Sequence, residues 1–337
     1  PDAGSLALNR VIGGDPSAIF GRLSANGQVF LINPHGVLFG AGAQVNVGAL
    51  VASTLELPDA DFLAGNYRFQ QSAASKAVVN HGRLSAAPGG YIALFGREVR
   101  NTGSIVAVRG SVALGAGERV TLGLHENQLI RFSVDSGTVG ALIDNGGIIQ
   151  AEGGQVLLSV QAKAAMRRAV VNQTGLIEAK SLTERNGVIR LEGGSEGQVR
   201  VGGRLDVSAA TPHAHGGSIT IKGGANLQVA GSLLAAAGHA GGDGGSIETS
   251  APAVDFTGAS VAAHALNGRN GRWLIDPTDV TINAAQAATI VSSLNAGTDV
   301  AVQTVAAGAQ PGNITVAASI VKTGGGSATL QLQAHNN

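Results

Sequence analysis

A chain of 337 residues with 51 glycines and only 3% aromatic residues must fill its core with aliphatic side chains, which favours thin stacked layers over one thick globule. Basic and acidic residues number 22 each, so the sequence carries no electrostatic footprint for nucleic acid or an anionic membrane. Cysteine is absent, which excludes disulfides and thiolate metal sites, and no apolar run approaches the roughly 18 residues that span a bilayer.

The first informative segment is a four-residue turn between two short apolar runs, residues 29–32 and 37–39. Asparagine stands first in the turn, proline second and glycine fourth, which are the residue preferences of a type I β-turn. The pattern predicts a strand, a sharp turn and a second strand. The residues of the turn are Asn33, Pro34, His35 and Gly36.

From residue 80 onward the chain repeats itself around the pattern Asn-x-Gly-x-(Ile/Leu)-x-Ala. The glycines of this pattern and its looser copies follow one another at steps of 21, 44, 28, 28, 28 and 27, and the step of 44 is interpreted as two periods. One period predicts one coil of a solenoid. The glycines are Gly82, Gly103, Gly147, Gly175, Gly203, Gly231 and Gly258.

A second set of glycines lies between those of the first, and each precedes a few residues that alternate apolar with small or polar side chains. This is the periodicity of a strand with one buried face. With two or more strands per coil and no helix-length segment between them, the sequence predicts an all-β, pectin-lyase-like solenoid, a right-handed parallel β-helix. About ten coils, each rising about 4.8 Å, would make a rod of roughly 50 Å. The glycines of this set are Gly90, Gly110, Gly154, Gly187, Gly217 and Gly245.

The recurrent asparagines have a backbone explanation. Asparagine tolerates left-handed geometry, and stacked asparagine side chains can hydrogen-bond from coil to coil. We therefore predict that Asn80, Asn101 and Asn145 form a structural ladder and bind no ligand. One segment departs from the coil pattern: Asn283 can cap a short helix over residues 284–295, and Gly297 lies just beyond its end.

Parallel β-helices also carry carbohydrate-active enzymes, which need carboxylates clustered on one face. The closest carboxylates here are Asp59 with Asp61 and Asp276 with Asp279, all beside prolines in turn-like sequence. No catalytic site assembles from these residues, so the sequence predicts that the chain is not an enzyme.

Four histidines raise the question of a metal site. His239 and His264 follow His215 at steps of 24 and 25, close to one coil each, so three imidazoles could stack in a column with His213 beside them. A row of exposed polar residues in glycine-rich turns is the favoured alternative, because no carboxylate or cysteine completes a ligand set. We predict no metal and no cofactor, and leave open whether the column binds anything.

The turn at Asn33 and its surroundings, over residues 6–69, resemble the secretion domain of two-partner secretion exoproteins, the filamentous haemagglutinin family of Gram-negative bacteria. That family carries Asn-Pro-Asn-Gly at such a turn, where this chain has His35 as the third residue. Residues 272–279, Arg-Trp-Leu-Ile-Asp-Pro-Thr-Asp, are similar to the family's exit into its repeat shaft. A second family motif, Asn-Pro-Asn-Leu, is absent, and we expect a signal peptide and further strands upstream of Pro1.

The resemblance implies three segments: residues 1–79 as part of the secretion domain, 80–275 as β-helix coils, and 276–337 as an exit segment with the short helix. It also implies that periplasmic domains of a dedicated outer-membrane β-barrel transporter recognise the chain, which then crosses unfolded and folds outside, to be secreted or held at the cell surface. Asn33, Pro34, His35 and Gly36 would act in partner recognition or in coil nucleation.

Two other functions stay open at this point: an adhesin site for host glycans or receptors within the chain, and a carbohydrate-active β-helix enzyme. The effector activity of a full-length exoprotein cannot be read from these residues.

Overall fold

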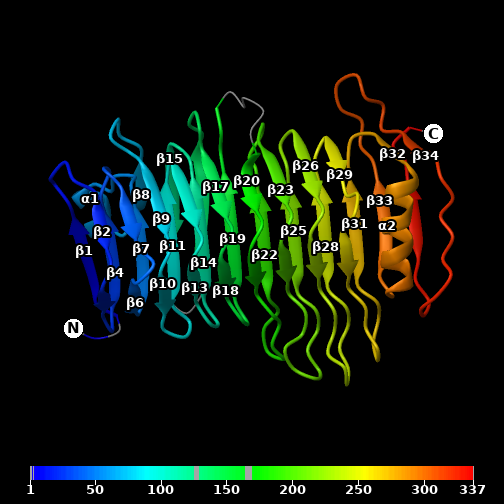
Figure 1. Ribbon diagram of the computed structural model, residues 1–337, viewed down its shortest axis with the longest axis horizontal. Helices are drawn as coiled ribbons and strands as arrows, with labels where there is room; N and C mark the ends of the chain where they lie inside the picture. Colours follow the sequence, from blue (N-terminus) through cyan, green and yellow to red (C-terminus); the bar gives the residue numbers. More distant parts are fainter. Residues whose placement is uncertain (1, 3, 125–128, 164–168, 337) are drawn as a thin grey trace.

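The computed structural model describes residues 2, 4–124, 129–163 and 169–336, and in these residues three long parallel sheets form the walls of a rod (Figure 1). We call them sheets A, B and C, because each coil passes through them in that order. Sheet A has 12 strands. They are β1 (Leu6–Arg10), β4 (Gln28–Ile32), β7 (Ala49–Ser53), β11 (Tyr91–Gly96), β14 (Ser111–Ala116), β19 (Gln155–Val160), β22 (Val188–Glu192), β25 (Ser218–Lys222), β28 (Ser246–Ser250), β31 (Arg272–Asp276), β33 (Asp299–Gln303) and β35 (Leu330–Gln333).

Sheets B and C have nine strands each. Sheet B contains β2 (Ser17–Ile19), β5 (Val37–Phe39), β9 (Ala77–Asn80), β12 (Glu98–Asn101), β17 (Leu142–Asn145), β20 (Ala169–Gln173), β23 (Gln198–Val201), β26 (Asn226–Val229) and β29 (Ala253–Asp255). Sheet C contains β3 (Arg22–Ser24), β6 (Gln44–Val47), β10 (Arg83–Ala86), β13 (Ser104–Val106), β18 (Ile148–Gln150), β21 (Leu176–Glu178), β24 (Arg204–Asp206), β27 (Ser232–Leu234) and β30 (Ser260–Ala262). The predicted all-β parallel β-helix is confirmed.

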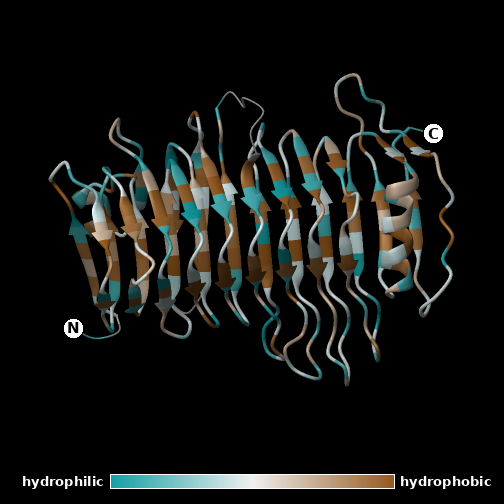
Figure 2. Cartoon of the chain, viewed as in Figure 1, coloured by the Kyte–Doolittle hydropathy of each residue, from teal (hydrophilic) through white to brown (hydrophobic). Residues whose placement is uncertain are grey.

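The core is a set of side-chain columns that run along the rod. Since every strand pairs in parallel register with the equivalent strand of the next coil, each inward side chain lies on the equivalent side chain of its neighbour. Figure 2 shows hydrophobic residues recurring strand after strand along the whole rod. One sheet A column, buried throughout, consists of Leu50, Ile92, Val112, Val156, Ile189, Ile219, Ile247, Trp273 and Val300.

The repeated glycines stand at the corners between sheets B and C, and at six of the seven an added Cβ would lie 2.0–2.7 Å from an atom of the preceding coil. Gly258 is the exception, with no atom within 4 Å of its Cβ position. A Cβ on Gly103 would collide with the carbonyl oxygen of Gly82, and a Cβ on Gly203 with that of Gly175. Only glycine lets two backbones approach so closely. The period in the sequence is therefore the spacing of these contacts.

The prediction that the step of 44 residues contains two periods is wrong. Strand β13 pairs directly with β18, with Ile105 beside Ile149, so the 44 residues between Gly103 and Gly147 make one coil and not two. The extra residues leave the coil after β14 and form two further strands. Sheet A accordingly has nine strands from β4 to β31, which gives eight coils over this stretch and not ten.

The strands that leave the coil build a small antiparallel sheet, which we call the cover sheet. It joins β8 (Tyr67–Gln70), β15 (Arg119–Gly123) and β16 (Arg131–Ser136) in the order β16-β15-β8. It lies on the outer face of sheet A, where Phe69 meets Phe95 edge to face at 5.3 Å between ring centres. Strands β7, β11 and β14 are therefore buried on both faces. The sequence analysis did not predict this sheet.

Two helices occur in the described residues, and the longer one matches its prediction. Helix α2 (Ala284–Asn295) begins with a capping box, in which Asn283 Oδ1 accepts from Gln286 N–H at 3.0 Å and Gln286 Oε1 accepts from Asn283 N–H at 3.4 Å. It packs on β30, at the place where the next strand of sheet C would lie. The other helix is α1 (Asp59–Leu63), before β8. Neither has the length and apolarity to cross a bilayer.

The last elements of the chain continue sheet A and add one separate pair of strands. Strands β33 and β35 extend sheet A beyond β31. Strands β32 (Val280–Ile282) and β34 (Ile314–Val316) pair with each other in parallel, outside the three long sheets.

The corner contact predicts a sharp difference between two adjacent glycines. Gly203→Ala should lower the free energy of unfolding by about 2–3 kcal/mol, because the new Cβ has no room beneath the neighbouring coil. Gly202→Ala is the matched control, since nothing lies within 4 Å of its Cβ position, and it should change stability by less than about 0.5 kcal/mol. Urea unfolding followed by far-UV circular dichroism measures both. Equal losses would contradict the corner contact.

Candidate functional site

The turn predicted to act in recognition or nucleation forms the corner between β4 and β5. Gly36 N–H donates to the Asn33 carbonyl at 3.1 Å, the bond that closes a β-turn, and His35 N–H donates to Asn33 Oδ1 at 3.0 Å. Gly36 has a φ of 125°, a backbone conformation that residues other than glycine rarely adopt. The local sequence thus determines the corner.

Asn33 connects three successive coils, and its side chain is fully buried. Its Nδ2 donates to the carbonyl of Asp15 at 3.0 Å and lies 2.9 Å from Ser17 Oγ, both in the preceding coil. Its backbone N–H donates to the carbonyl of Ser53 at 2.9 Å in the following coil. A buried amide with all these partners is costly to replace, because each partner would lose its bond.

Pro34 and His35 differ in how much of each residue is buried. Pro34 is buried, and its carbonyl accepts from Lys76 N–H at 3.1 Å. His35 is half-buried, and its Nδ1 has no hydrogen-bond partner in the described part of the chain. Of the four turn residues, His35 therefore contributes least to the hydrogen bonds that hold the corner.

The three asparagines named as a ladder lie in register on sheet B and hydrogen-bond to one another. Asn80 Nδ2 donates to Asn101 Oδ1 at 2.8 Å, and Asn101 Nδ2 donates to Asn145 Oδ1 at 2.7 Å. Asn145 Nδ2 donates to Gln173 Oε1 at 2.6 Å, and Gln173 Nε2 donates to the Gly175 carbonyl at 2.9 Å. Sequence analysis missed Gln173, which occupies the asparagine position of the next coil. All four side chains are fully buried.

The histidines do not stack in the column that was considered as an alternative. His215 Nδ1 accepts from Asp243 N–H at 2.9 Å, so the coil step places Asp243 beside it and not His239. The His239 carbonyl accepts from Asn267 Nδ2 at 3.0 Å. Within residues 2, 4–124, 129–163 and 169–336, no group of three histidine, cysteine or acidic residues is placed to hold a metal ion.

The closest acidic residues have separate structural contacts. Asp59 pairs with Arg10 at 2.6 Å. Asp279 Oδ1 accepts from the N–H groups of Gly312 and Asn313 at 2.8 and 2.6 Å, which holds the loop before β34. These two carboxylates therefore fix loops.

Register brings one acidic pair together that the sequence did not indicate. Ser250 Oγ lies 2.9 Å from Glu248 Oε1 and 3.4 Å from Asp276 Oδ2, on the outer face of sheet A. Lys222 Nζ lies 3.0 Å from Glu248 Oε1. Partial burial, followed by the Glu248 charge, raises the pKa of Asp276 above its ordinary value. The cluster lies on strands β25, β28 and β31, where the Lys222–Glu248 ion pair joins two coils and Ser250 lies within hydrogen-bond distance of Asp276 in the third.

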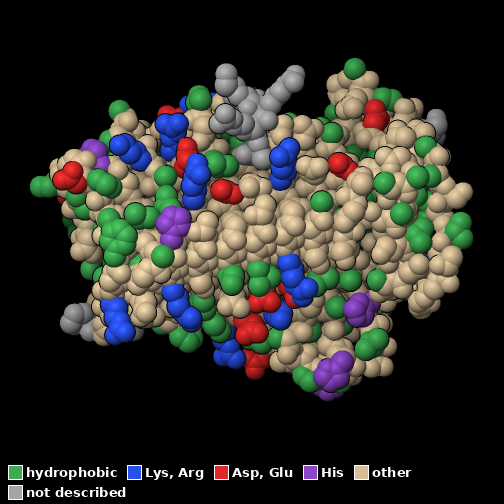
Figure 3. Space-filling view, in the orientation of Figure 1, with side chains coloured by type: hydrophobic (Ala, Val, Ile, Leu, Met, Phe, Trp, Pro, Cys, Tyr) green, Lys and Arg blue, Asp and Glu red, His purple; other side chains and the backbone are tan. Residues whose placement is uncertain are grey.

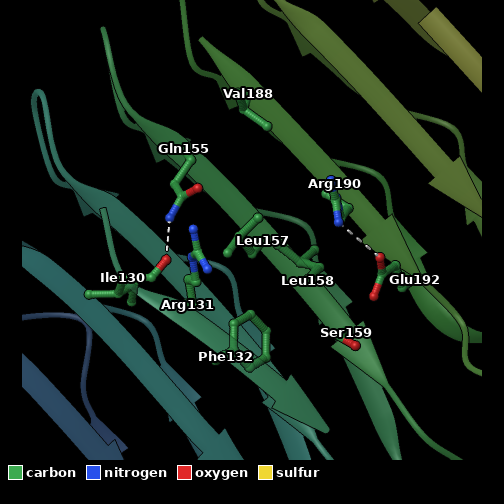
Figure 4. A pocket seen from close by; sticks show the side chains of 10 residues that line it. All are labelled: Ile130, Arg131, Phe132, Gln155, Leu157, Leu158, Ser159, Val188, Arg190 and Glu192. Atoms are coloured by element: carbon green, nitrogen blue, oxygen red, sulfur yellow. Dashed lines mark hydrogen bonds and ion pairs between the residues drawn. The ribbon is translucent and has the colours of Figure 1, made fainter. Parts of the chain in front are cut away.

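A groove of 340 Å³ lies where the cover sheet ends and the outer face of sheet A becomes accessible (Figure 4). Leu157 and Val188 lie on its floor, and Phe132 of β16 forms its wall. Gln155 points toward the Ile130 carbonyl and donates to it at 2.6 Å. Glu192, 3.7 Å from Arg190, is the single carboxylate among the described residues that line the groove.

The visible face of the rod carries basic and acidic side chains interspersed along its length (Figure 3). No continuous basic surface forms on this face.

Comparison with known proteins gives three findings. A family described as the TPS secretion domain matches residues 1–207. A heme/hemopexin-binding protein of Haemophilus influenzae is 30% identical over 216 residues, which are 61% of this chain and 23% of that protein. A second protein of that name from Haemophilus influenzae is 28% identical over 212 residues, 57% of this chain and 22% of its own length. The chain thus spans less than a quarter of these relatives.

The third finding is a solved structure, the secretion domain of HMW1 from Haemophilus influenzae. It superposes with a TM-score of 0.75 at 23% identity, covering 99% of this chain and 86% of that chain. The two share the fold.

The ladder yields a prediction about stability. Asn101→Ala removes two bonds and leaves Asn80 Nδ2 and Asn145 Oδ1 buried without partners, so it should cost about 2–4 kcal/mol of unfolding free energy. Asn172→Ala, on the same sheet, is the control, because its half-buried side chain makes one bond to Asp144, and it should cost less than about 1 kcal/mol. Chemical unfolding of both variants gives the comparison. A loss at Asn101 no greater than that at Asn172 would contradict the ladder's contribution.

Proposed function

The chain belongs to the TPS secretion domain family, and on this premise we propose that its first coils nucleate the folding of the rod through the turn at Asn33. The chain is a secretion and targeting module of a two-partner secretion exoprotein. Such exoproteins are exported across the outer membrane of Gram-negative bacteria by a partner transporter and are then released or displayed on the surface. The part played by each residue in this process is our proposal.

The observation that carries the proposal is the set of bonds around Asn33. One buried amide joins Asp15 and Ser17 of one coil to its own corner, and its backbone reaches Ser53 of the next coil. A solenoid coil gains most of its stability from its neighbours, so the first contact between coils is the costly step. A residue that joins three coils at once lowers that cost. We therefore assign Asn33, Pro34 and Gly36 to coil nucleation.

We assign His35 to recognition by the transporter's periplasmic domains. Its side chain is half-buried, and its buried Nδ1 has no hydrogen-bond partner among the described residues, so this nitrogen adds no bond to the fold. A side chain that is recognised before the chain folds should be one that contributes little to the stability of the fold.

Growth of the rod from a folded first coil explains how export can proceed without nucleotide hydrolysis at the outer membrane. Each new coil that emerges pairs its three strands with those of the coil before it. The backbone bonds and buried columns that form are lost again only if the coil unfolds, so folding outside opposes return of the chain.

We also propose that the segments differ in role along this continuous rod. Residues 1–79 provide the recognition and nucleation segment, residues 80–275 the regular coils, and residues 276–337 the exit. The exit begins where α2 takes the place of a strand of sheet C. Strand β9 (Ala77–Asn80) crosses the first of these limits and pairs with β5 and β12 on its two sides.

Separating nucleation from recognition requires two variants and two readouts. Asn33→Ala should lower unfolding free energy by about 2–3 kcal/mol and reduce secretion through the cognate transporter, because it leaves buried groups without partners. His35→Ala should change stability by less than about 1 kcal/mol and still reduce secretion.

The control is Asn46→Ala, an exposed asparagine of β6, which should change neither readout. Secretion is measured as exoprotein in the culture supernatant, and stability by urea unfolding of the purified domain. If Asn33→Ala leaves both unchanged, the turn is not the nucleus. If His35→Ala secretes normally, recognition lies elsewhere.

A further inference from the structure

Arg109 adopts a backbone conformation that arginine rarely takes. Its φ is 56°, and it is the one described residue other than glycine with positive φ. The equivalent corner positions in the adjacent coils carry Gly89, with φ 81°, and Gly153, with φ 64°. Glycine adopts this conformation without strain, and a strained residue kept in its place is a marker of function. The backbone conformation does not explain why arginine occupies position 109, so we looked for a role of its side chain.

The Arg109 side chain lines a groove along the corner between sheets C and A. The groove has a volume of 820 Å³ and includes Tyr67, Tyr91 and Arg185 among its lining residues. An adjoining hollow of 440 Å³ is lined by Arg109, Arg185 and Glu184. Arg185 Nη1 donates to the Arg109 carbonyl at 3.1 Å, although the two residues lie 76 positions apart. The fold thus brings two arginines to one concave surface.

Neither arginine forms an ion pair with another residue of the described part of the chain. Arg109 and Arg185 have no carboxylate within 4.0 Å in the described part of the chain, whereas Arg204 and Arg269 pair with aspartates at 2.7 Å. Both side chains are exposed. A guanidinium without a partner binds a carboxylate through two parallel hydrogen bonds. Glu184 is the acidic side chain that faces the same hollow and opposes such a ligand.

Two tyrosines, Tyr67 and Tyr91, add aromatic surface to the groove. Tyr91 O–H donates to Gln28 Oε1 at 2.6 Å, which fixes its ring, and burial raises the pKa of Tyr91 far above its ordinary value. Tyr67 is half-buried and rests on Phe30, with ring centres 5.3 Å apart, so part of its ring is available to a ligand. Aromatic surfaces beside a few oriented polar groups are typical of sites for small ligands.

We propose that this groove binds an acidic sugar residue, whose carboxylate pairs with Arg109 and Arg185 and whose ring lies against Tyr67. An acidic sugar suits the site because it combines a planar carboxylate with an apolar C–H face. The site uses residues outside the Asn33 turn.

The test is titration of the complete chain with four probes, monitored by ligand-observed NMR: N-acetylneuraminic acid, glucuronic acid, glucose and a hexapeptide of glutamate. Both acidic sugars should bind saturably, and glucose should bind at least about tenfold more weakly, the change expected for loss of a charge-assisted hydrogen bond. Arg185→Gln should weaken binding of the acidic sugars by about tenfold, and Glu184→Gln should strengthen it. Arg200→Gln, on the exposed face of sheet B, is the control and should change nothing.

The decisive variant is Arg109→Gly, which restores the residue found in the adjacent coils. It should weaken acidic-sugar binding about tenfold while leaving the Tm unchanged or raising it by about 1 °C, because the strain is relieved. A lower Tm with unchanged binding would show a structural role and overturn the proposal. Binding of the glutamate hexapeptide without the sugars would also overturn it, as would the absence of saturable binding by either acidic sugar.

Discussion

The close approach of neighbouring coils at their corners is the constraint on which the rest of this structure depends. At Gly103 and Gly203 there is room for hydrogen and nothing larger, and glycine recurs at this corner in each of the coils from Gly82 to Gly231. A fixed corner fixes the register of the three strands that leave it. Fixed register then places like residues on like, with Ile189, Ile219 and Ile247 stacked in the core. The asparagine ladder follows from the same alignment, because amide side chains reach each other only when the coils are in register.

The first coils of the rod differ from the later ones in how much they bury. The cover sheet lies over β7, β11 and β14, which are buried on both faces. In β25 and β28, buried inward side chains alternate with more exposed outward ones. Asn33 adds buried hydrogen bonds across the earliest coils. Additional apolar burial and satisfied polar groups support our proposal that these coils form first. A nucleus at the start of the chain suits a protein that leaves its transporter one coil at a time.

Local patterns in the sequence predicted the coil, the ladder and the capped helix, because each depends on residues that recur or lie close together. Asn283 and Gln286 are three positions apart, and the corner glycines repeat every 28 residues or so. The cover sheet could not be predicted this way, since β8 and β15 pair across about 50 residues and neither strand belongs to the repeat. The same insertion made one coil of 44 residues look like two. The stacking of His215, His239 and His264 that the sequence left open does not occur, because a coil of 28 residues aligns His215 with Asp243.

The central claim is that the rod folds from its first coils onward, and pulse-labelling hydrogen exchange during refolding tests it most directly. The purified chain is diluted from urea, labelled at increasing times and analysed by mass spectrometry of its peptides. The account predicts that amides of β4, β5 and β7 gain protection first, with those of β25, β28 and β31 following later. Protection that appears first in β25 to β31, or at the same time in all coils, would contradict it.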